Sequence, residues 1–191
     1  PNARPSPMRI AIDPVCVSKN FDALRNNPAV QESAQLHARG LPVAEMIQAL
    51  AMNNRVLAAF AGFGGIYPEG SLERPLLEKV ILCVSTINAC QFCVNSHLDV
   101  TRALGIPGDG VTDPKAAGHS ERERLALEYA TAVRRDSNRV PDDLFNRLHA
   151  AFSDAELVEL TWVVGFINLL NWFNNALGVR YRGEFEGMDV R

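Results

Sequence analysis

Apolar side chains recur every three or four residues along most of the chain, which is the spacing of a helix with one buried face. The pattern predicts helices over residues 21–25, 29–39, 42–60, 72–87, 89–104, 120–135, 141–152 and 153–177. Residues 80–84 are apolar throughout, as in a buried strand, but the flanking segments have helical length and pattern. No stretch alternates with the period of two that is typical of a strand. The sequence therefore predicts an all-α fold.

Residues that favour helix ends support these boundaries. Ser120 with Glu123, and Ser153 with Glu156, fit the capping box, in which the two side chains bond each other's backbone N–H groups. Gly178 follows the last predicted helix, where glycine readily adopts the left-handed conformation that ends a helix. Two helix starts and one helix end are therefore well marked.

The chain divides into an arm and one domain. The first twenty residues contain four prolines and predict an irregular N-terminal arm, whereas residues 21–191 predict a single helical domain. A chain of 191 residues buries about 70% of its unfolded surface, so it needs neither a disulfide nor a metal ion to stay folded. The Gly64-Gly65 pair has no strand before it and no Lys-Ser/Thr after it, which excludes a phosphate-binding loop.

Charge and hydropathy exclude two classes of partner. The formal net charge is −3, and no basic stripe is present, so we expect no nucleic acid partner. Polar residues interrupt every long apolar stretch, so we expect no membrane span. The proline-rich start lacks the apolar core of a secretory signal, which favours a cytoplasmic location.

The candidate chemistry lies in the segment Cys90-Gln91-Phe92-Cys93-Val94-Asn95-Ser96-His97. On a helix, offsets of 0, 3 and 7 residues fall within about 60° of each other, so Cys90, Cys93 and His97 share one face. The two cysteines are expected at the second and fifth helical positions, where backbone N–H groups stabilise a thiolate. His97 follows Cys93 by one turn, within the reach that a base needs, directly or through one water.

A carboxylate joins this group through the geometry of a hairpin. Asn88 is expected to be the N-cap of the helix over 89–104, with Gln91 as its reciprocal partner, and so marks the turn. Glu78 precedes Asn88 by ten residues and His97 follows it by nine, so two antiparallel helices bring them level. Glu78 could then orient the imidazole. Carboxylate, imidazole and two thiols are what a cysteine peroxidase needs, because a sulfenic acid forms on one thiol and the other closes a disulfide.

The spacing from Glu78 through Cys90 and Cys93 to His97 resembles the signature of AhpD-like alkylhydroperoxidases, in the carboxymuconolactone decarboxylase superfamily. The resemblance covers about residues 72–105. It implies an all-helical bundle built on a helical hairpin, assembled as a homo-oligomer, usually a trimer or hexamer. It further implies an antioxidant enzyme that reduces peroxide through a redox-active disulfide, without an additional cofactor.

The same resemblance assigns roles. Cys93 would be the peroxidatic thiol, Cys90 the resolving thiol exposed to the reductant, and Glu78 with His97 the proton relay. A lipoyl-bearing or thioredoxin-like dithiol protein would then reopen the disulfide. This chain departs from the best-studied branch at Phe92, where that branch has a histidine. One relay group is therefore missing, and the activation of Cys90 falls to the helix terminus and Glu78.

Two other functions fit the same residues. One is a thiol–disulfide oxidoreductase without peroxidase turnover. The other is a zinc-binding or structural oligomer, in which the cysteine pair and His97 supply three ligands and Glu78 or water the fourth.

Several further residues are expected to have structural roles. Cys83 is interpreted as a core residue and Cys16 as non-catalytic, while His37, His119 and His149 are expected at the surface or in local contacts. The apolar stripe of Trp162, Phe166, Leu169, Leu170 and Phe173 is typical of a core or a subunit interface. Within it, Asn168 and Asn171 either satisfy buried backbone groups or line a pocket.

Overall fold

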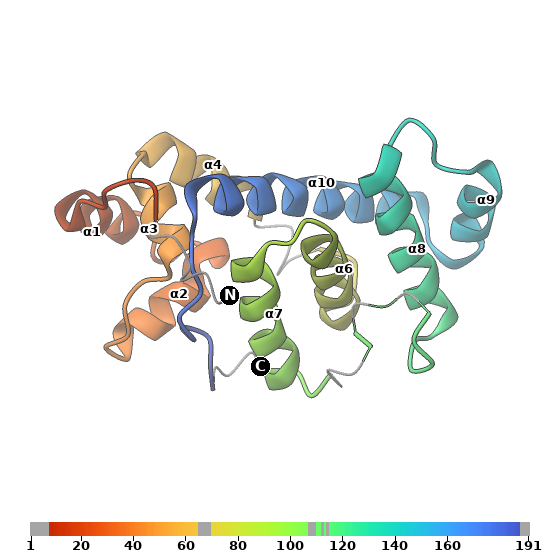
Figure 1. Ribbon diagram of the computed structural model, residues 1–191, viewed down its shortest axis with the longest axis horizontal. Coiled ribbons are helices and arrows are strands. Elements are labelled where there is room, and N and C mark those ends of the chain that lie inside the picture. Colours follow the sequence, from red (N-terminus) through yellow and green to blue (C-terminus); the bar gives the residue numbers. More distant parts are fainter. Residues whose placement is uncertain (1–7, 65–69, 107–109, 112, 114, 188–191) are drawn as a thin grey trace, which may run out of the picture.

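The computed structural model describes residues 8–64, 70–106, 110, 111, 113 and 115–187, and every regular element within these ranges is a helix (Figure 1). The predicted all-α fold is confirmed. The helices are α1 (Pro14–Asp22), α2 (Pro28–Ala38), α3 (Glu45–Ala51), α4 (Asn54–Gly64), α6 (Arg74–Ile87), α7 (Gln91–Ala103), α8 (Glu121–Asp136), α9 (Asp142–Ala151) and α10 (Asp154–Leu177). None of the helices in these ranges is both long and apolar enough to cross a bilayer.

Helix α10 runs along the molecule and the other helices are arranged beside it (Figure 1). Helices α1 to α4 gather at its C-terminal end, and α8 and α9 lie at its N-terminal end. The antiparallel pair α6 and α7 forms a hairpin against the middle of α10, and α6 also packs against α8. The hairpin that carries the predicted site is therefore supported by the longest helix.

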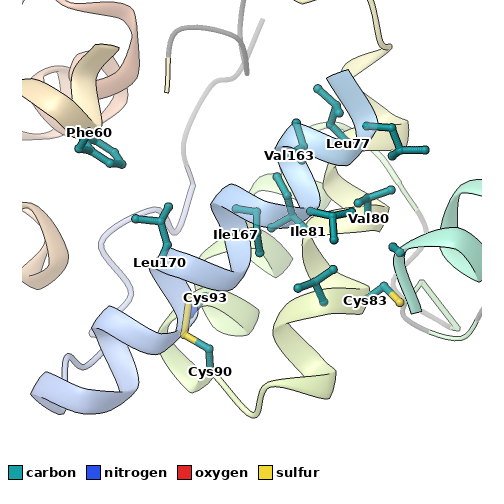
Figure 2. Close-up of a cluster of buried hydrophobic side chains, with 14 of the residues drawn as sticks. Phe60, Leu77, Val80, Ile81, Cys83, Cys90, Cys93, Val163, Ile167 and Leu170 are labelled. Atoms are coloured by element: carbon teal, nitrogen blue, oxygen red, sulfur yellow. A yellow bond between two sulfur atoms is a disulfide. The ribbon is translucent and has the colours of Figure 1, made fainter. Parts of the chain in front are cut away.

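The position of α6 in the core explains why residues 80–84 of this helix are all apolar. Residues 76–85 are all buried, because α7, α8 and α10 cover different sides of this helix. Such a helix shows no polar face, which is why its sequence also fits a buried strand. Figure 2 shows Leu77, Val80 and Ile81 of α6 together with Val163 and Ile167 of α10.

The predicted helix caps at both ends of α10 and at the start of α8 are confirmed. Both capping boxes, Ser120 with Glu123 and Ser153 with Glu156, form with their reciprocal hydrogen bonds. Gly178 ends α10 with φ of 67°, a left-handed conformation that glycine adopts without steric cost.

The expectation of an irregular arm over residues 1–20 is wrong for residues 14–20, which belong to α1. Residues 1–7 lie outside the described residues. The side chain of Asp13 accepts a hydrogen bond from the N–H of Val15 at 2.9 Å. Pro14 occupies the first helical position, where an N–H group would have no partner within the helix, so the absence of this group in proline costs nothing. Helix α1 ends at Asp22, so the short helix expected over 21–25 is also wrong.

The helix predicted over residues 42–60 is two helices, α3 and α4. The break falls at Asn53, whose side-chain oxygen accepts hydrogen bonds from the N–H groups of Arg55 at 3.1 Å and Val56 at 3.4 Å. An asparagine side chain that bonds the backbone in this way competes with the helix and begins a new one.

The turn of the hairpin differs from the prediction by two residues. Asn88 is the C-cap of α6, and Cys90 is the N-cap of α7. The Oδ1 atom of Asn88, which would have to cap α7, instead accepts a hydrogen bond from Nε of Arg134. The Nδ2 atom of Asn88 donates to the Oδ1 atoms of Asn168 at 2.7 Å and Asn171 at 2.9 Å. Between the caps, Ala89 has φ of 51°, the left-handed conformation that glycine usually supplies at this position.

Candidate active site

Cys90 and Cys93 form a disulfide at the start of α7, beside α10 (Figure 2). Their Cα atoms are 5.3 Å apart, within the usual range for a disulfide. Cys90 is the N-cap and Cys93 the third helical residue, rather than the second and fifth as predicted. The backbone N–H of Cys93 donates to the Cys90 sulfur at 3.3 Å. The first turn of α7 therefore directs its backbone dipoles toward the sulfurs, which favours a thiolate once the disulfide is reduced.

Both cysteines are buried, with exposed fractions of 0% for Cys90 and 5% for Cys93. The expectation that Cys90 is exposed to the reductant is therefore wrong for this chain. Cys90 belongs to the hydrophobic core, and its sulfur is turned back over the first turn of α7 as the cap of that helix.

Glu78 and His97 meet across the hairpin. The Nδ1 atom of His97, on α7, lies 2.7 Å from the Oε2 atom of Glu78, on α6. The other carboxylate oxygen of Glu78 accepts a hydrogen bond from Nε of Arg74 at 2.9 Å. Glu78 is 0% exposed and the His97 side chain 23%. The prediction that these two residues lie level is confirmed, and the carboxylate is held between a guanidinium and an imidazole.

Asparagines of α10 hold the turn that presents the disulfide. Asn171 donates to the hydroxyl of Ser85 at 3.1 Å, and Asn175 donates to the carbonyl of Asn88 at 2.9 Å. Asn168 donates to the carbonyl of Val164 at 2.8 Å. The side-chain oxygens of Asn168 and Asn171 also accept hydrogen bonds from Asn88. Both asparagines therefore bond the side chain of a turn residue, in addition to any backbone group.

Asn174 is a site residue that the sequence analysis missed. Its Nδ2 atom lies 3.3 Å from the Cys93 sulfur and 3.4 Å from the Met46 sulfur. A signal was present, because asparagines recur every three residues on this helix, at 168, 171 and 174, and a fourth follows at 175.

Phe92, which lies between the two cysteines, is a packing residue. It is buried and its ring meets that of Tyr181 edge to face, with centroids 6.0 Å apart. The Tyr181 hydroxyl donates to Asp99 of α7 and accepts from the N–H of Phe185 at 3.0 Å. Burial, together with the bond to Asp99, raises the pKa of Tyr181. Phe92 thus ties α7 to the segment after α10.

Ion pairs with the buried carboxylate of Glu45 fix the same C-terminal segment to α3. Glu45 accepts hydrogen bonds from Arg180 at 2.9 Å and from Arg182 at 2.7 Å. Burial of Glu45 raises its pKa, but the hydrogen bonds from Arg180 and Arg182 outweigh burial and hold the pKa below its ordinary value. Both ties place residues 180–185 against the helices that surround the disulfide.

The remaining cysteines and histidines make local contacts elsewhere. Cys83 is a core residue, as predicted, and its sulfur lies 3.5 Å from the Thr131 hydroxyl on α8. Burial raises the pKa of the Cys83 thiol. Cys16 lies 3.7 Å from the carbonyl of Ala51. The histidine contacts are His37 with Leu41, His119 with Asp113 and His149 with Asp154. Across the described ranges, no cluster of three or more His, Cys, Asp or Glu side chains could hold a metal ion.

Fold and site together define an all-helical protein with a CxxC disulfide on a hairpin. No family model matches the chain. The chain is 36% identical over 129 residues to the uncharacterised protein YnjA of Escherichia coli, covering 60% of this chain and 69% of YnjA. A structure from Agrobacterium tumefaciens, of unknown function and proposed to be the antioxidant defence protein AhpD, is 27% identical with a TM-score of 0.64, covering 68% of this chain and 92% of its own.

Two other solved structures share the fold over nearly the whole chain. An uncharacterised peroxidase-related protein from Silicibacter has a TM-score of 0.77 at 22% identity, covering 98% of both chains. The debrominase Bmp8 has a TM-score of 0.71 at 17% identity, covering 94% of this chain and 95% of its own. The chain has the AhpD-like fold of the carboxymuconolactone decarboxylase superfamily.

Proposed function

We propose that this protein is a thiol-dependent peroxidase that reduces hydrogen peroxide or organic hydroperoxides through Cys90 and Cys93. The observation that carries the proposal is the pairing of His97 with the buried carboxylate of Glu78, on the same hairpin as the disulfide. A buried carboxylate that accepts a hydrogen bond from an imidazole orients the ring and stabilises its protonated form. Such a pair can take up and return the proton that thiol oxidation requires.

The proposed reaction has three steps. The Cys93 thiolate attacks the terminal oxygen of the hydroperoxide and becomes a sulfenic acid, while the leaving alkoxide takes a proton and departs as an alcohol, or as water from hydrogen peroxide. The Cys90 thiol then displaces the hydroxyl from Cys93 as water, and the disulfide closes. A dithiol reductant finally reopens the disulfide and is itself oxidised. The relay of Glu78 and His97 moves protons in the first two steps.

The reductant is proposed to be a lipoyl-bearing or thioredoxin-like protein of the cytoplasm. Dithiols of this kind stay reduced there, and they attack disulfides by exchange. Because both cysteines are buried in the described structure, attack requires a local opening around the turn at residues 88–90.

We also propose that the protein is a homo-oligomer, a trimer or hexamer, with the outer face of α10 at the subunit interface. Val158, Trp162, Leu169 and Trp172 are 71%, 42%, 53% and 60% exposed, and they follow one another at intervals of three, four or seven residues. A groove of about 780 Å³ runs over this face and includes Phe63 and Phe145 in its lining. An apolar surface of this kind is typical of an interface.

The test of the function is turnover. With a dithiol reductant in excess, the protein should consume many equivalents of tert-butyl hydroperoxide, and Cys93→Ser should abolish this while Cys83→Ser retains it. A protein whose disulfide exchanges rapidly with the dithiol but which consumes no peroxide would instead be a thiol–disulfide oxidoreductase. Elemental analysis that finds stoichiometric zinc in the reduced protein would favour the metal-binding alternative.

A further inference from the structure

Asn174 of α10 places its carboxamide against the sulfur of Cys93. Its Nδ2 atom donates to Cys93 Sγ at 3.3 Å and to Met46 Sδ at 3.4 Å. The side chain is 1% exposed, and its Oδ1 atom has no hydrogen-bond partner among the described residues. The amide is therefore buried, and both acceptors that it faces are sulfur atoms.

The neighbouring asparagines show what a purely structural amide does on this helix. The Nδ2 atoms of Asn168, Asn171 and Asn175 all donate to oxygen, and these bonds hold the turn of the hairpin or the helix itself. Thioether and disulfide sulfurs are weak acceptors, so Asn174 is poorly satisfied while Cys93 is oxidised. Leucine, of similar volume, would fill the same place without burying an unpaired oxygen.

A thiolate changes this balance. A hydrogen bond to a charged acceptor is roughly twice as strong as one between neutral groups, so the Nδ2–H group of Asn174 gains most when Cys93 carries a negative charge. No such contact to Cys90 is recorded from the described part of α10, and the Cys90 sulfur receives the backbone N–H of Cys93 instead. The surroundings thus distinguish the two cysteines.

We propose that Asn174 is a catalytic residue of the redox site, and that its side-chain N–H stabilises the thiolate of Cys93 after reduction of the disulfide. The inference rests on the proposed function, because it assigns the attacking thiolate to Cys93. By favouring the reduced form, the same contact raises the reduction potential of the Cys90–Cys93 pair.

The test measures ionisation of Cys93 without any peroxide. In a Cys90→Ser background, which removes coupling between the two thiols, the rate of Cys93 alkylation by iodoacetamide is followed against pH by peptide mass spectrometry. Asn174→Leu should move the midpoint upward by about one pH unit, and Asn174→Asp should move it further because two negative charges repel. Asn20→Ala is the matched control, since this amide on α1 donates to the carbonyl of Ala51 and to the sulfur of Cys16, outside the site, and its midpoint should stay at the parental value.

The outcomes separate the inference from the proposed function. Parental midpoints in both Asn174 variants, or an equal shift in Asn20→Ala, would overturn the role of Asn174. If circular dichroism shows that the leucine variant is unfolded, the aspartate variant decides. A shifted midpoint in a protein that consumes no peroxide would support the thiolate contact and remove the peroxidase proposal alone.

Discussion

The Nδ1 atom of His97 lies 2.7 Å from the Oε2 atom of Glu78, although 19 positions separate them in the sequence. The turn between α6 and α7 brings these two residues together, and hydrogen bonds with the asparagines of α10 hold the turn in place. Since Glu78 is fully buried and also bonds Arg74, the carboxylate holds the imidazole in one orientation. The proposed relay is therefore preorganised in the fold before any substrate binds.

Removing the imidazole should slow oxidation of Cys93. His97→Ala is expected to lower the second-order rate of thiol oxidation by hydroperoxide by about 10²-fold and to move its pH dependence upward, because the base is lost. Stopped-flow fluorescence or peroxide consumption measures both effects. His149→Ala, at a half-exposed ion pair with Asp154, is the control and should retain the parental rate. An unchanged pH profile in His97→Ala would count against the relay.

The left-handed residue in the turn carries a stability prediction. Ala89 adopts φ of 51°, which costs a residue with a Cβ atom more than it costs glycine. Ala89→Gly should therefore raise the free energy of unfolding by about 1 kcal/mol, as measured by urea denaturation. Ala132→Gly, inside α8, should instead lower it by about 1 kcal/mol. A loss of stability in Ala89→Gly would show that the turn is not strained.

The buried carboxylate of Glu45 predicts acid sensitivity. Its pKa in the folded protein lies below the ordinary value of 4.5, so it stabilises the fold above pH 4.5 and this contribution is lost as the pH falls through the folded value. Glu45→Gln should lower the free energy of unfolding at pH 7 by about 2 kcal/mol and flatten its decrease between pH 5 and 3, as urea titrations at several pH values measure. Glu128→Gln, at an exposed pair with Arg147, should change neither quantity measurably.

The exposed face of α10 predicts the effect of a charge at the proposed interface. Trp172→Glu should dissociate the oligomer into monomers, because the unpaired carboxylate would be buried between subunits. Light scattering coupled to size exclusion measures the mass. Arg139→Ala, at an 86% exposed side chain, should keep the parental mass. A wild-type protein that is monomeric at micromolar concentration would remove the interface from the proposal.

The sequence predicts the hairpin well because the registration of Glu78 with His97 tolerates small errors. Moving the helix start from Ala89 to Gln91 leaves the two residues level, since each lies about ten positions from the turn. The cap itself could not be predicted, because the amide of Asn88 bonds residues that are 80 and 83 positions away. Local capping preferences carry no information on such partners.

The position of Asn174 beside the disulfide could not be predicted for a related reason. The contact between Asn174 and Cys93 joins residues 81 positions apart, and it depends on how α10 crosses the hairpin. Helix α1 is a different case, because Asp13 and Pro14 form a recognisable helix start that the surrounding prolines obscured. Helical pattern therefore predicted the elements, while the packing between them determined the burial of Cys90.

The decisive measurement is the thiol count of the reduced protein after one equivalent of hydroperoxide. We expect a loss of two thiols per chain, a peptide map with Cys90 linked to Cys93, and a trappable sulfenic acid on Cys93 in Cys90→Ser. The Cys93→Ser variant should lose no thiols over the time in which the parental protein loses two. A sulfenic acid found on Cys90 alone, or a thiol count that stays constant while peroxide persists, would contradict the proposed chemistry.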